Sequence, residues 1–335
     1  MTPRRASLAG VPLGEGLPVA VAGALNVSPE SFHAGSVRTA REALRRAALA
    51  MAEAGAALVD VGARSTAPYR GADPDEAEEC RRLGEAVEWL AGRVPVPLSA
   101  DTTRPGPARA ALEAGARVIN DVSGLRDPRL AALVREHRAG LILTATPIVA
   151  GSVRPARTES GLTQRRRGTD TPVQPSAPSQ RPSEATGLSR APEPGGGPVQ
   201  RVRMLLREAL GRAREAGIPE ERVVLDPGIG FFRDETVSWD EWDVRVLAGL
   251  DALSDLGRPL CVGVSRKSFL GAVTGRAHPG DRLAGSLAAT ALAVLHGAAL
   301  VRTHDVAETL DAIRVAERVR RATMAPAMRE EASGP

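Results

Sequence analysis

The chain alternates short apolar runs with amphipathic stretches, and this alternation restricts the folds that it can adopt. Between most of the runs, as in residues 39–55 and 201–217, apolar residues recur at three- and four-residue spacing, which predicts helices. Near-continuous apolar strands crossed by helices are typical of a parallel sheet that is covered on both faces. Eight runs have this apolar character: 19–27, 57–63, 97–103, 118–124, 140–146, 223–230, 260–265 and 299–305.

Eight strand–helix units predict a (β/α)₈ TIM barrel, an α/β fold whose typical size is about 250 residues. The 335 residues of the chain are enough for one such barrel. A doubly wound open sheet is the alternative fold, and it usually carries a glycine-rich dinucleotide turn after its first strand. Residues 26–36 read NVSPESFHAGS at that position, so the barrel is favoured.

One long segment, residues 148–199, differs in composition from the rest of the chain. Pro, Ser, Gly, Thr, Gln and Arg dominate it, and its few apolar residues show no periodicity. Such a segment cannot bury enough apolar surface to offset the entropy lost on ordering, so it predicts a disordered insert after the fifth strand. The other predicted units are an N-terminal extension at 1–17, one barrel formed by 18–147 and 200–320, and a loose tail at 321–335.

The net charge of +4 is compatible with nucleic-acid binding, but the position of the charge favours another explanation. Seven arginines and only four acidic residues lie between Pro147 and Pro198, so the rest of the chain is close to neutral. Cys80 and Cys261 show no metal-site spacing, and no run reaches the ~18 apolar residues of a membrane span. We therefore expect a cytoplasmic protein that binds neither nucleic acid nor membrane.

Polar residues close every one of the eight apolar runs. In a TIM barrel the active site is built at the carboxyl ends of the strands, so these residues are expected to face one shared cavity. Asp60 and Asp121 are also explained by a simpler role, the capping of a loop. The strand ends carry Asn26; Asp60 with Ser65 and Thr66; Asp101 with Thr102; Asn120 with Asp121; Thr144 with Thr146; Asp226; Ser265 with Arg266 and Lys267; and Arg302 with His304 and Asp305.

The chemistry of these side chains predicts a ligand with two parts. Asp101, Asn120 and Asp226 offer hydrogen-bond acceptors and one amide, which suits a planar heterocycle with ring N–H and amino groups. A second group offers donors for an anion such as phosphate, and it consists of Asn26, Ser65, Thr66, Arg302 and His304. Together they predict a heterocycle that carries a phosphorylated arm.

Several motifs occur in the order, and at the strand ends, that are typical of one enzyme family. They are NVSPESF at 26–32, DVGARSTAP at 60–68, ADTT at 100–103, INDVSG at 119–124, LDPGIGF at 225–231, VGVSRKSFLG at 262–271 and VRTHDVAET at 301–309. On these residues the chain resembles the dihydropteroate synthase family. The resemblance implies a homodimeric transferase of folate biosynthesis that joins 6-hydroxymethyl-7,8-dihydropterin pyrophosphate to p-aminobenzoate, releases pyrophosphate and uses Mg²⁺.

The resemblance also implies roles for residues of this chain, motif by motif. The pterin ring is expected to contact Asp101, Asn120, Asp226 and Lys267, and all of these except Asn120 are expected to be catalytic. The pyrophosphate is expected to contact Asn26, Thr66, Arg302 and His304, with Asn26 as the magnesium ligand. Phe32 and Ser265 are expected to border the aryl-amine pocket. In the family mechanism pyrophosphate leaves first, and the amine attacks the resulting pterin cation.

Lys267 is the only lysine among 44 basic residues, and compositional drift explains the excess of arginine. The place of Lys267 in the SRKS motif gives a separate reason for this one lysine. An ammonium is a compact donor, whereas a guanidinium is wider and presents a fixed planar fork, so arginine would not replace it readily.

The chain departs from the family pattern at several loop positions. The departures are Ala34 for aspartate, Arg64 for glutamate, Ala67 for arginine, 144–146 (Thr-Ala-Thr) for Met-His-Met, and Phe232 with Arg233 for Gly-Lys. They gather on the side of the second substrate. They therefore favour a related, bulkier aryl amine as acceptor, such as the ribosylated aniline of methanopterin-type cofactor synthesis.

Two other functions fit parts of the pattern. A pterin-dependent methyltransferase moves a methyl group from a tetrahydrofolate-like donor to a corrinoid protein, and it shares the barrel and its acceptors. Such an enzyme has no use for the pyrophosphate site that the SRKS and RTHD motifs predict. A non-catalytic pterin-binding paralogue is favoured by the loop departures. The synthase is the leading interpretation, because it accounts for both parts of the predicted ligand.

Overall fold

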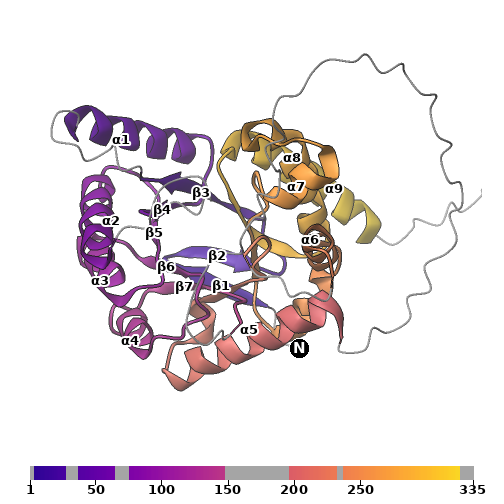
Figure 1. Ribbon diagram of the computed structural model, residues 1–335, viewed down its shortest axis with the longest axis horizontal. Coiled ribbons are helices and arrows are strands. Elements are labelled where there is room, and N and C mark those ends of the chain that lie inside the picture. Colours follow the sequence, from indigo (N-terminus) through magenta and orange to yellow (C-terminus); the bar gives the residue numbers. More distant parts are fainter. Residues whose placement is uncertain (1–3, 28–36, 65–74, 148–195, 232–236, 325–335) are drawn as a thin grey trace, which may run out of the picture.

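Eight parallel strands close into a barrel, and helices surround it (Figure 1). The computed structural model describes residues 4–27, 37–64, 75–147, 196–231 and 237–324. Every predicted strand is present, which confirms the (β/α)₈ fold. The barrel strands are β3 (Ala20–Asn26), β4 (Leu58–Gly62), β5 (Leu98–Asp101), β6 (Val118–Asp121), β7 (Gly140–Thr144), β8 (Val223–Asp226), β9 (Leu260–Val262) and β10 (Ala298–Thr303), and β10 pairs with β3 to close the ring.

The local sequence explains where several helices begin. Asp75 accepts a hydrogen bond from the Glu78 backbone N–H at 2.8 Å, and Asp127 accepts one from the Arg129 N–H at 2.9 Å. Both are N-caps, which satisfy backbone donors that a first helical turn leaves unpaired. The helices of the described ranges are α1 (Val37–Glu53), α2 (Glu76–Leu90), α3 (Pro105–Ala114), α4 (Pro128–Glu136), α5 (Gly197–Glu215), α6 (Trp239–Ala248), α7 (Ser268–Thr274), α8 (Leu283–Leu295) and α9 (Val306–Met324).

The two-residue period of each strand divides its side chains between the outer helices and the barrel interior. On β4, Val59 and Val61 are 0% exposed and pack in the core between the strands and the helices. Leu58 points the other way, into the barrel. The innermost apolar layer consists of Ala22, Leu58, Val118, Ile142, Val224, Cys261 and Leu300.

A hairpin closes the amino-terminal end of the barrel. It consists of β1 (Arg5–Leu8) and β2 (Val11–Gly14), within the predicted extension at 1–17. Leu8 and Leu13 are 0% exposed and pack against the innermost apolar layer. A Cβ built on Gly140, at the start of β7, would lie only 2.8 Å from Leu8 Cδ2, so the hairpin sits tightly at this end. The carboxyl-terminal end is therefore the end at which a site can form.

Two of the predicted segment boundaries differ from the ends of the observed helices. Helix α5 begins at Gly197 with Pro198 in its first turn, a position that favours proline, so residues 197–199 belong to a helix and not to the insert. Helix α9 continues to Met324, beyond the predicted end of the barrel at residue 320. Residues 148–195 lie outside the described residues, and the disorder of the insert stays a prediction.

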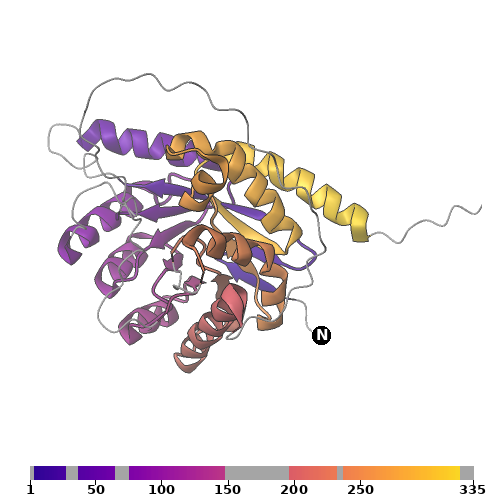
Figure 2. The same cartoon turned by 45° about the vertical axis from the view of Figure 1, so that its right-hand side comes forward.

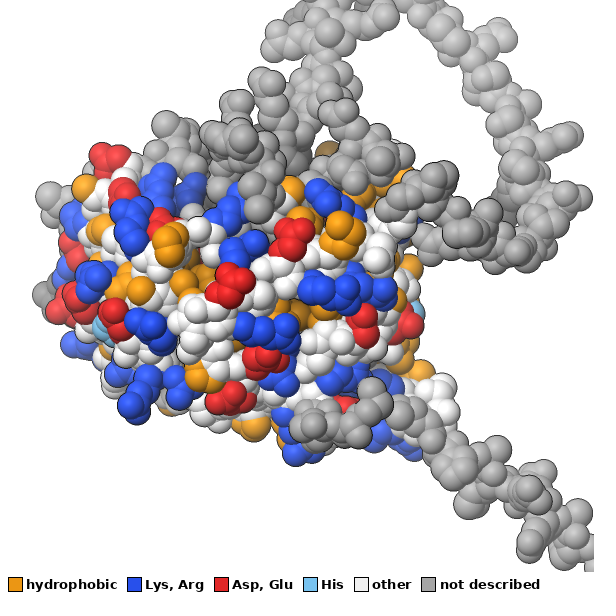
Figure 3. Space-filling model, turned by 90° about the horizontal axis from the view of Figure 1, so that it is seen from below, with side chains coloured by type: hydrophobic (Ala, Val, Ile, Leu, Met, Phe, Trp, Pro, Cys, Tyr) orange, Lys and Arg blue, Asp and Glu red, His pale blue; other side chains and the backbone are white. Residues whose placement is uncertain are grey.

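The outer surface of the described residues carries mixed charge. Figure 3 shows basic and acidic side chains interspersed on the face seen from below, with small apolar patches between them. Surface ion pairs contribute to this pattern, as where Arg203 and Arg207 each lie 3.4 Å from a carboxylate oxygen of Asp255. Within the described ranges, no helix combines the length and apolar character needed to cross a bilayer.

Replacing Leu8 with alanine is expected to lower the free energy of unfolding by about 3 kcal/mol, because a fully buried leucine leaves a cavity that its neighbours fill only partly. Urea denaturation measures this change. Met204→Ala, at a side chain that is 41% exposed, is the control and should cost less than about 1 kcal/mol. Equal losses in the two variants would contradict the packing of the hairpin into the barrel.

Candidate active site

Polar side chains form a second layer inside the barrel, next to the apolar one. On five strands a polar residue follows two positions after a member of the apolar layer, so both point inward. These pairs are Leu58 and Asp60, Val118 and Asn120, Ile142 and Thr144, Val224 and Asp226, and Leu300 and Arg302. The period of the strands thus gathers the predicted polar residues at the carboxyl end of the barrel.

The Arg302 guanidinium connects three strands in this layer. Its Nε donates to Asp60 Oδ2 at 2.6 Å, and its Nη2 donates to Asp101 Oδ2 at 2.9 Å. Asn120 Nδ2 also donates to Asp60 Oδ2, at 3.0 Å. One buried hydrogen-bonded network thus spans β4, β5, β6 and β10. It joins two carboxylates, the Arg302 guanidinium and the Asn120 amide.

The two aspartates with an alternative loop-capping role behave differently. Asp121 accepts hydrogen bonds from the backbone N–H groups of Ser123 at 2.9 Å and Leu125 at 2.5 Å, so it is a loop cap. Asp60 is 0% exposed and bonds across the barrel, so the capping interpretation is wrong for it. The sequence did indicate that Asp60 points inward, because it follows the inward-facing Leu58 by two residues on the same strand.

Burial changes the acidity of the carboxyl groups in this layer. Desolvation, with the nearby Asp60 charge, raises the pKa of Asp101 to about 6, although the charges of Arg302, Arg64 and Lys267 oppose the shift. Desolvation also raises the pKa of Asp226, against a hydrogen bond from the Gly228 N–H. Asp101 is thus mainly ionised at pH 7 and becomes neutral in mild acid.

The loop after β8 is held by two carboxylates, and Lys267 lies across it. Asp226 Oδ1 accepts from the Gly228 N–H at 2.7 Å, and Asp243 Oδ1, from α6, accepts from the Gly230 N–H at 3.0 Å. Gly230 has φ +82°, and a Cβ built there would lie 2.8 Å from Lys267 Cδ. Only glycine therefore fits both the backbone conformation and the close approach of the lysine.

The ammonium of Lys267 lies over an aromatic ring at the barrel mouth. Its Nζ is 3.9 Å from the centre of the Phe231 ring, within range of a cation–π interaction. Its charge also opposes the rise in the pKa values of Asp101 and Asp226, so it lies in the field of both carboxylates. The structure thus brings the predicted lysine to the predicted acceptors.

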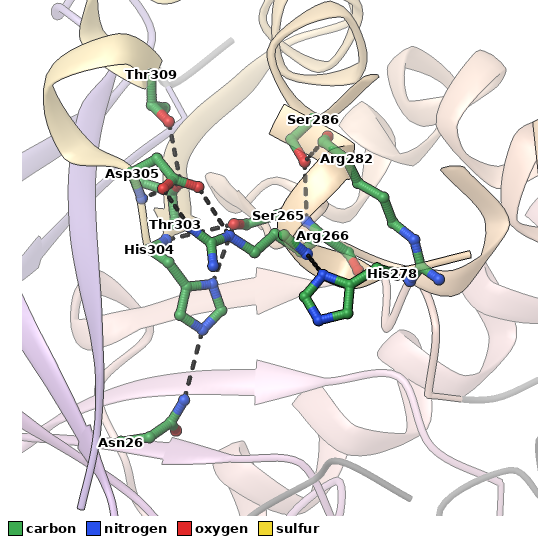
Figure 4. A network of polar contacts seen from close by, with 11 residues as sticks. Asn26, Ser265, Arg266, His278, Arg282, Ser286, Thr303, His304, Asp305 and Thr309 are labelled. Carbon is green, nitrogen blue, oxygen red and sulfur yellow. Dashed lines mark hydrogen bonds and ion pairs between the residues drawn. The ribbon is translucent and has the colours of Figure 1, made fainter. Parts of the chain in front are cut away.

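A second polar cluster, shown in Figure 4, lies beside this layer. Asn26 Nδ2 lies 3.5 Å from His304 Nε2, and Ser265 Oγ lies 3.0 Å from His304 Nδ1. Arg266 Nε donates to Asp305 Oδ2 at 3.1 Å, which places another cation next to the histidine. Desolvation, with the charges of Arg302 and Arg266, lowers the pKa of His304 to about 4. The imidazole is therefore neutral at pH 7.

Sequence reasoning missed Glu79, which is buried in α2 behind the site. Glu79 is 0% exposed and accepts from Thr102 Oγ1 at 2.6 Å and Arg104 Nη1 at 2.9 Å. Arg64 Nε lies 3.9 Å from Glu79 Oε2. Glu79 thus supplies the negative charge beside Arg64, one of the departures from the family pattern. A signal was present, because Glu79 lies four residues before Leu83 on the buried face of the helix.

Some predicted site residues lie outside the described ranges. They are Phe32, Ser65 and Thr66, together with the departures at Ala34, Ala67, Phe232 and Arg233. Of the predicted residues that are described, the structure gathers Asp101, Asn120, Asp226, Lys267 and Arg302 in the barrel mouth, with Asn26, Ser265 and His304 in the adjoining cluster.

The donor set fits a weakly held divalent cation. The described part of the chain contains no group of three or more His, Cys, Asp or Glu side chains that could bind a metal. Asn26 Oδ1 and Asp101 Oδ2 each lie 3.6 Å from a Cβ built on Gly62, so an amide oxygen and a carboxylate oxygen lie near this glycine, on the neighbouring strands β3 and β5. Mg²⁺ commonly keeps several waters and binds one or two protein oxygens together with substrate phosphates.

Comparisons with known proteins identify the family to which this chain is similar. A family model described as "Pterin binding enzyme" matches residues 22–304. A probable bifunctional folylpolyglutamate synthase/dihydropteroate synthase of Halobacterium salinarum is 34% identical over 91% of this chain, which spans only 32% of that protein. The dihydropteroate synthase of Escherichia coli is 32% identical over 89% of this chain and 90% of that enzyme.

One solved structure aligns with almost the whole of this chain. It is the Xanthomonas albilineans dihydropteroate synthase with 4-aminobenzoic acid, which aligns with a TM-score of 0.72 and 35% sequence identity. The alignment covers 97% of this chain and 100% of the Xanthomonas chain.

Glu79→Gln is expected to lower the free energy of unfolding by about 2–3 kcal/mol, because it leaves the guanidinium groups of Arg104 and Arg64 without their buried counter-charge. Both guanidinium groups are partly exposed, so the expected loss of stability is smaller than for a fully buried ion pair. The control is Glu85→Gln on the same helix, which pairs with Arg41 and Arg81 at the surface and should cost under about 1 kcal/mol. Chemical denaturation of both variants measures the difference, and similar losses would contradict a special role for Glu79.

Proposed function

Because the chain belongs to the dihydropteroate synthase family of pterin-binding enzymes, we propose that it joins 6-hydroxymethyl-7,8-dihydropterin pyrophosphate to p-aminobenzoate. The product is 7,8-dihydropteroate, and pyrophosphate is released. The observation that carries the proposal is the buried polar layer of Asp101, Asn120 and Asp226 with Lys267 at its mouth and the Asn26–His304 cluster beside it. It offers a place for each part of the substrate.

The pterin ring would lie on the buried polar layer. Asn120 Oδ1 makes no hydrogen bond among the described residues although it is buried, so an acceptor remains for a ring N–H or amino group. Asp226 supplies a carboxylate in the same layer, and its Oδ1 already accepts a hydrogen bond from the Gly228 N–H. The role of Lys267 would be to donate to a ring acceptor and to balance the carboxylate charges.

The pyrophosphate would lie toward Asn26 and His304, with Thr66 as a further donor. Arg302 is held by Asp60 and Asp101, so it would act on the anion through its charge. We assign Asn26 as the protein ligand of Mg²⁺. When bound, this ion would neutralise part of the charge on the leaving group.

The reaction would break the C–O bond between the pterin methylene group and the pyrophosphate. The electron pair leaves with the pyrophosphate, and the cation that remains is delocalised into the ring. The amine nitrogen then forms a C–N bond with the methylene carbon and loses one proton to water. The ionised Asp101, buried beside the ring, would stabilise the cation, and Phe32 and Ser265 would border the aryl amine.

A homodimer is the assembly that we propose. Helix α8 contains no charged residue, and its Leu292 and Leu295 are exposed. On the adjoining α9, Val315 and Val319 are also exposed, and the two helices lie side by side (Figure 2). An uncharged, partly exposed helix suits burial against a second copy of the chain. A cytoplasmic location is the compartment that we propose, consistent with Cys80 and Cys261 both being free thiols.

The purified chain is expected to release pyrophosphate when supplied with the pterin pyrophosphate, Mg²⁺ and p-aminobenzoate. A phosphate-coupled assay with mass detection of dihydropteroate measures this. A ribosylated aniline in a parallel reaction tests the bulkier acceptor. Lys267→Ala, with the ammonium removed, is the negative control. Absence of pyrophosphate release with either amine would overturn the proposed function.

The pH dependence of turnover should report Asp101. Because its pKa is about 6, protonation below that pH removes the negative charge beside the ring, so kcat/KM for the pterin substrate should fall as the pH drops through 6. Asp101→Asn should lower kcat/KM by about 100-fold or more and abolish this acidic limb. A limb that persists unchanged in the variant would assign it to another group, such as the substrate phosphates.

A further inference from the structure

Four buried polar atoms inside the barrel make no hydrogen bond among the described residues. They are Asp60 Oδ1, Ser99 Oγ, Asn120 Oδ1 and Thr144 Oγ1, one on each of the adjacent strands β4, β5, β6 and β7. Buried polar groups nearly always have a partner, so this row points to a polar ligand or ordered water at the barrel centre. Two of the atoms are acceptors only, and two are hydroxyls that can also donate.

Thr144 lies beside Asp226, which is assigned above to the pterin ring, and not on the side of the second substrate, where the departures at 144–146 were expected to gather. It is the last residue of β7, is 0% exposed, and pairs in register with Asp226 on β8. Its methyl carbon would lie 3.2 Å from a Cβ built on Gly228, so the methyl faces the loop that follows β8. The hydroxyl occupies a different branch of the same Cβ and has no protein partner among the described residues.

The layer around Thr144 is rich in acceptors, and several donors on its strands are already used, so Lys267 at its mouth is the donor assigned above. Asn120 Nδ2 is used by Asp60, and Arg302 Nε and Nη2 are used by Asp60 and Asp101. A pterin ring carries a keto oxygen and ring nitrogens that need donors, as well as N–H and amino groups that need acceptors. The Thr144 hydroxyl can supply a buried donor on the Asp226 side of the layer.

We propose that the Thr144 hydroxyl hydrogen-bonds the pterin ring beside Asp226 and increases the affinity for it. The family pattern has methionine in this place, so the hydrogen bond is a property of this chain. The inference rests on the proposed function. Thr144 is then a binding residue whose effect appears in the affinity for the pterin and not in the chemical step.

The test compares Thr144→Val, which replaces the hydroxyl with a methyl group of similar size, with Thr144→Ser, which keeps the hydroxyl. Valine should raise KM for the pterin pyrophosphate about tenfold, while kcat and KM for p-aminobenzoate stay within about twofold. Serine should restore KM to within about threefold of the parent value. Valine should also raise the melting temperature of the free protein by about 2 °C, because it removes a buried hydroxyl that has no protein partner.

Thr309→Val is the matched control. Thr309 is 2% exposed, but its hydroxyl lies 2.9 Å from that of Thr303, so this variant should lower the melting temperature and leave the pterin KM unchanged. An unchanged pterin KM in Thr144→Val would overturn the inference, as would a fall in kcat alone. If the parent protein shows no turnover, the proposed function fails. The hydrogen bond can still be tested with the same variants, because the fluorescence of 6-hydroxymethylpterin reports its binding.

Discussion

The ion pairs of Arg302 with Asp60 and Asp101 are the interaction on which the site depends. Three charged groups inside a closed barrel would each be costly alone, but the guanidinium donates to one oxygen of each carboxylate, and Asn120 adds a further hydrogen bond to Asp60. The network fixes four strands relative to one another at the barrel mouth. Because Asp60 and Arg302 hold each other, Asp101 and Asn120 are presented at fixed positions, which is the preorganisation that recognition of a rigid heterocycle requires.

Much of the fold followed from the sequence because a strand sorts its side chains by alternation. Each apolar run with a polar end marked a strand and its carboxyl terminus, and all eight strands formed as expected. The pairing of Asp60 with Arg302 was not predictable, because it joins residues 242 positions apart and depends on which strands meet across the barrel. The hairpin at Leu8 was missed for a similar reason: only the closed barrel offers the apolar layer that its side chains need.

Arg64 shows how a departure from a family pattern can be balanced elsewhere. An arginine in place of a glutamate adds positive charge beside Asp101, and this charge opposes the rise in the pKa of that carboxyl group. Glu79 on α2 lies against the same guanidinium and also holds Arg104 and Thr102. The added positive charge is therefore balanced by a buried carboxylate behind the site, while Asp101 and Asn120 lie in the buried network. A loop residue that departs from the family pattern can therefore occur in the same structure as the expected buried polar residues.

The pairing of β10 with β3 has a consequence for how the chain is made. The first and last strands of the barrel are neighbours, so the sheet has two open edges until residues 298–303 are in place. Open edges of apolar parallel strands invite pairing with other chains. Until the same strand arrives, Asp60 and Asp101 also lack the cation that balances them. The newly made chain therefore gains its closed sheet and the guanidinium that pairs with both carboxylates in one late step, and shorter products of synthesis would be prone to aggregation.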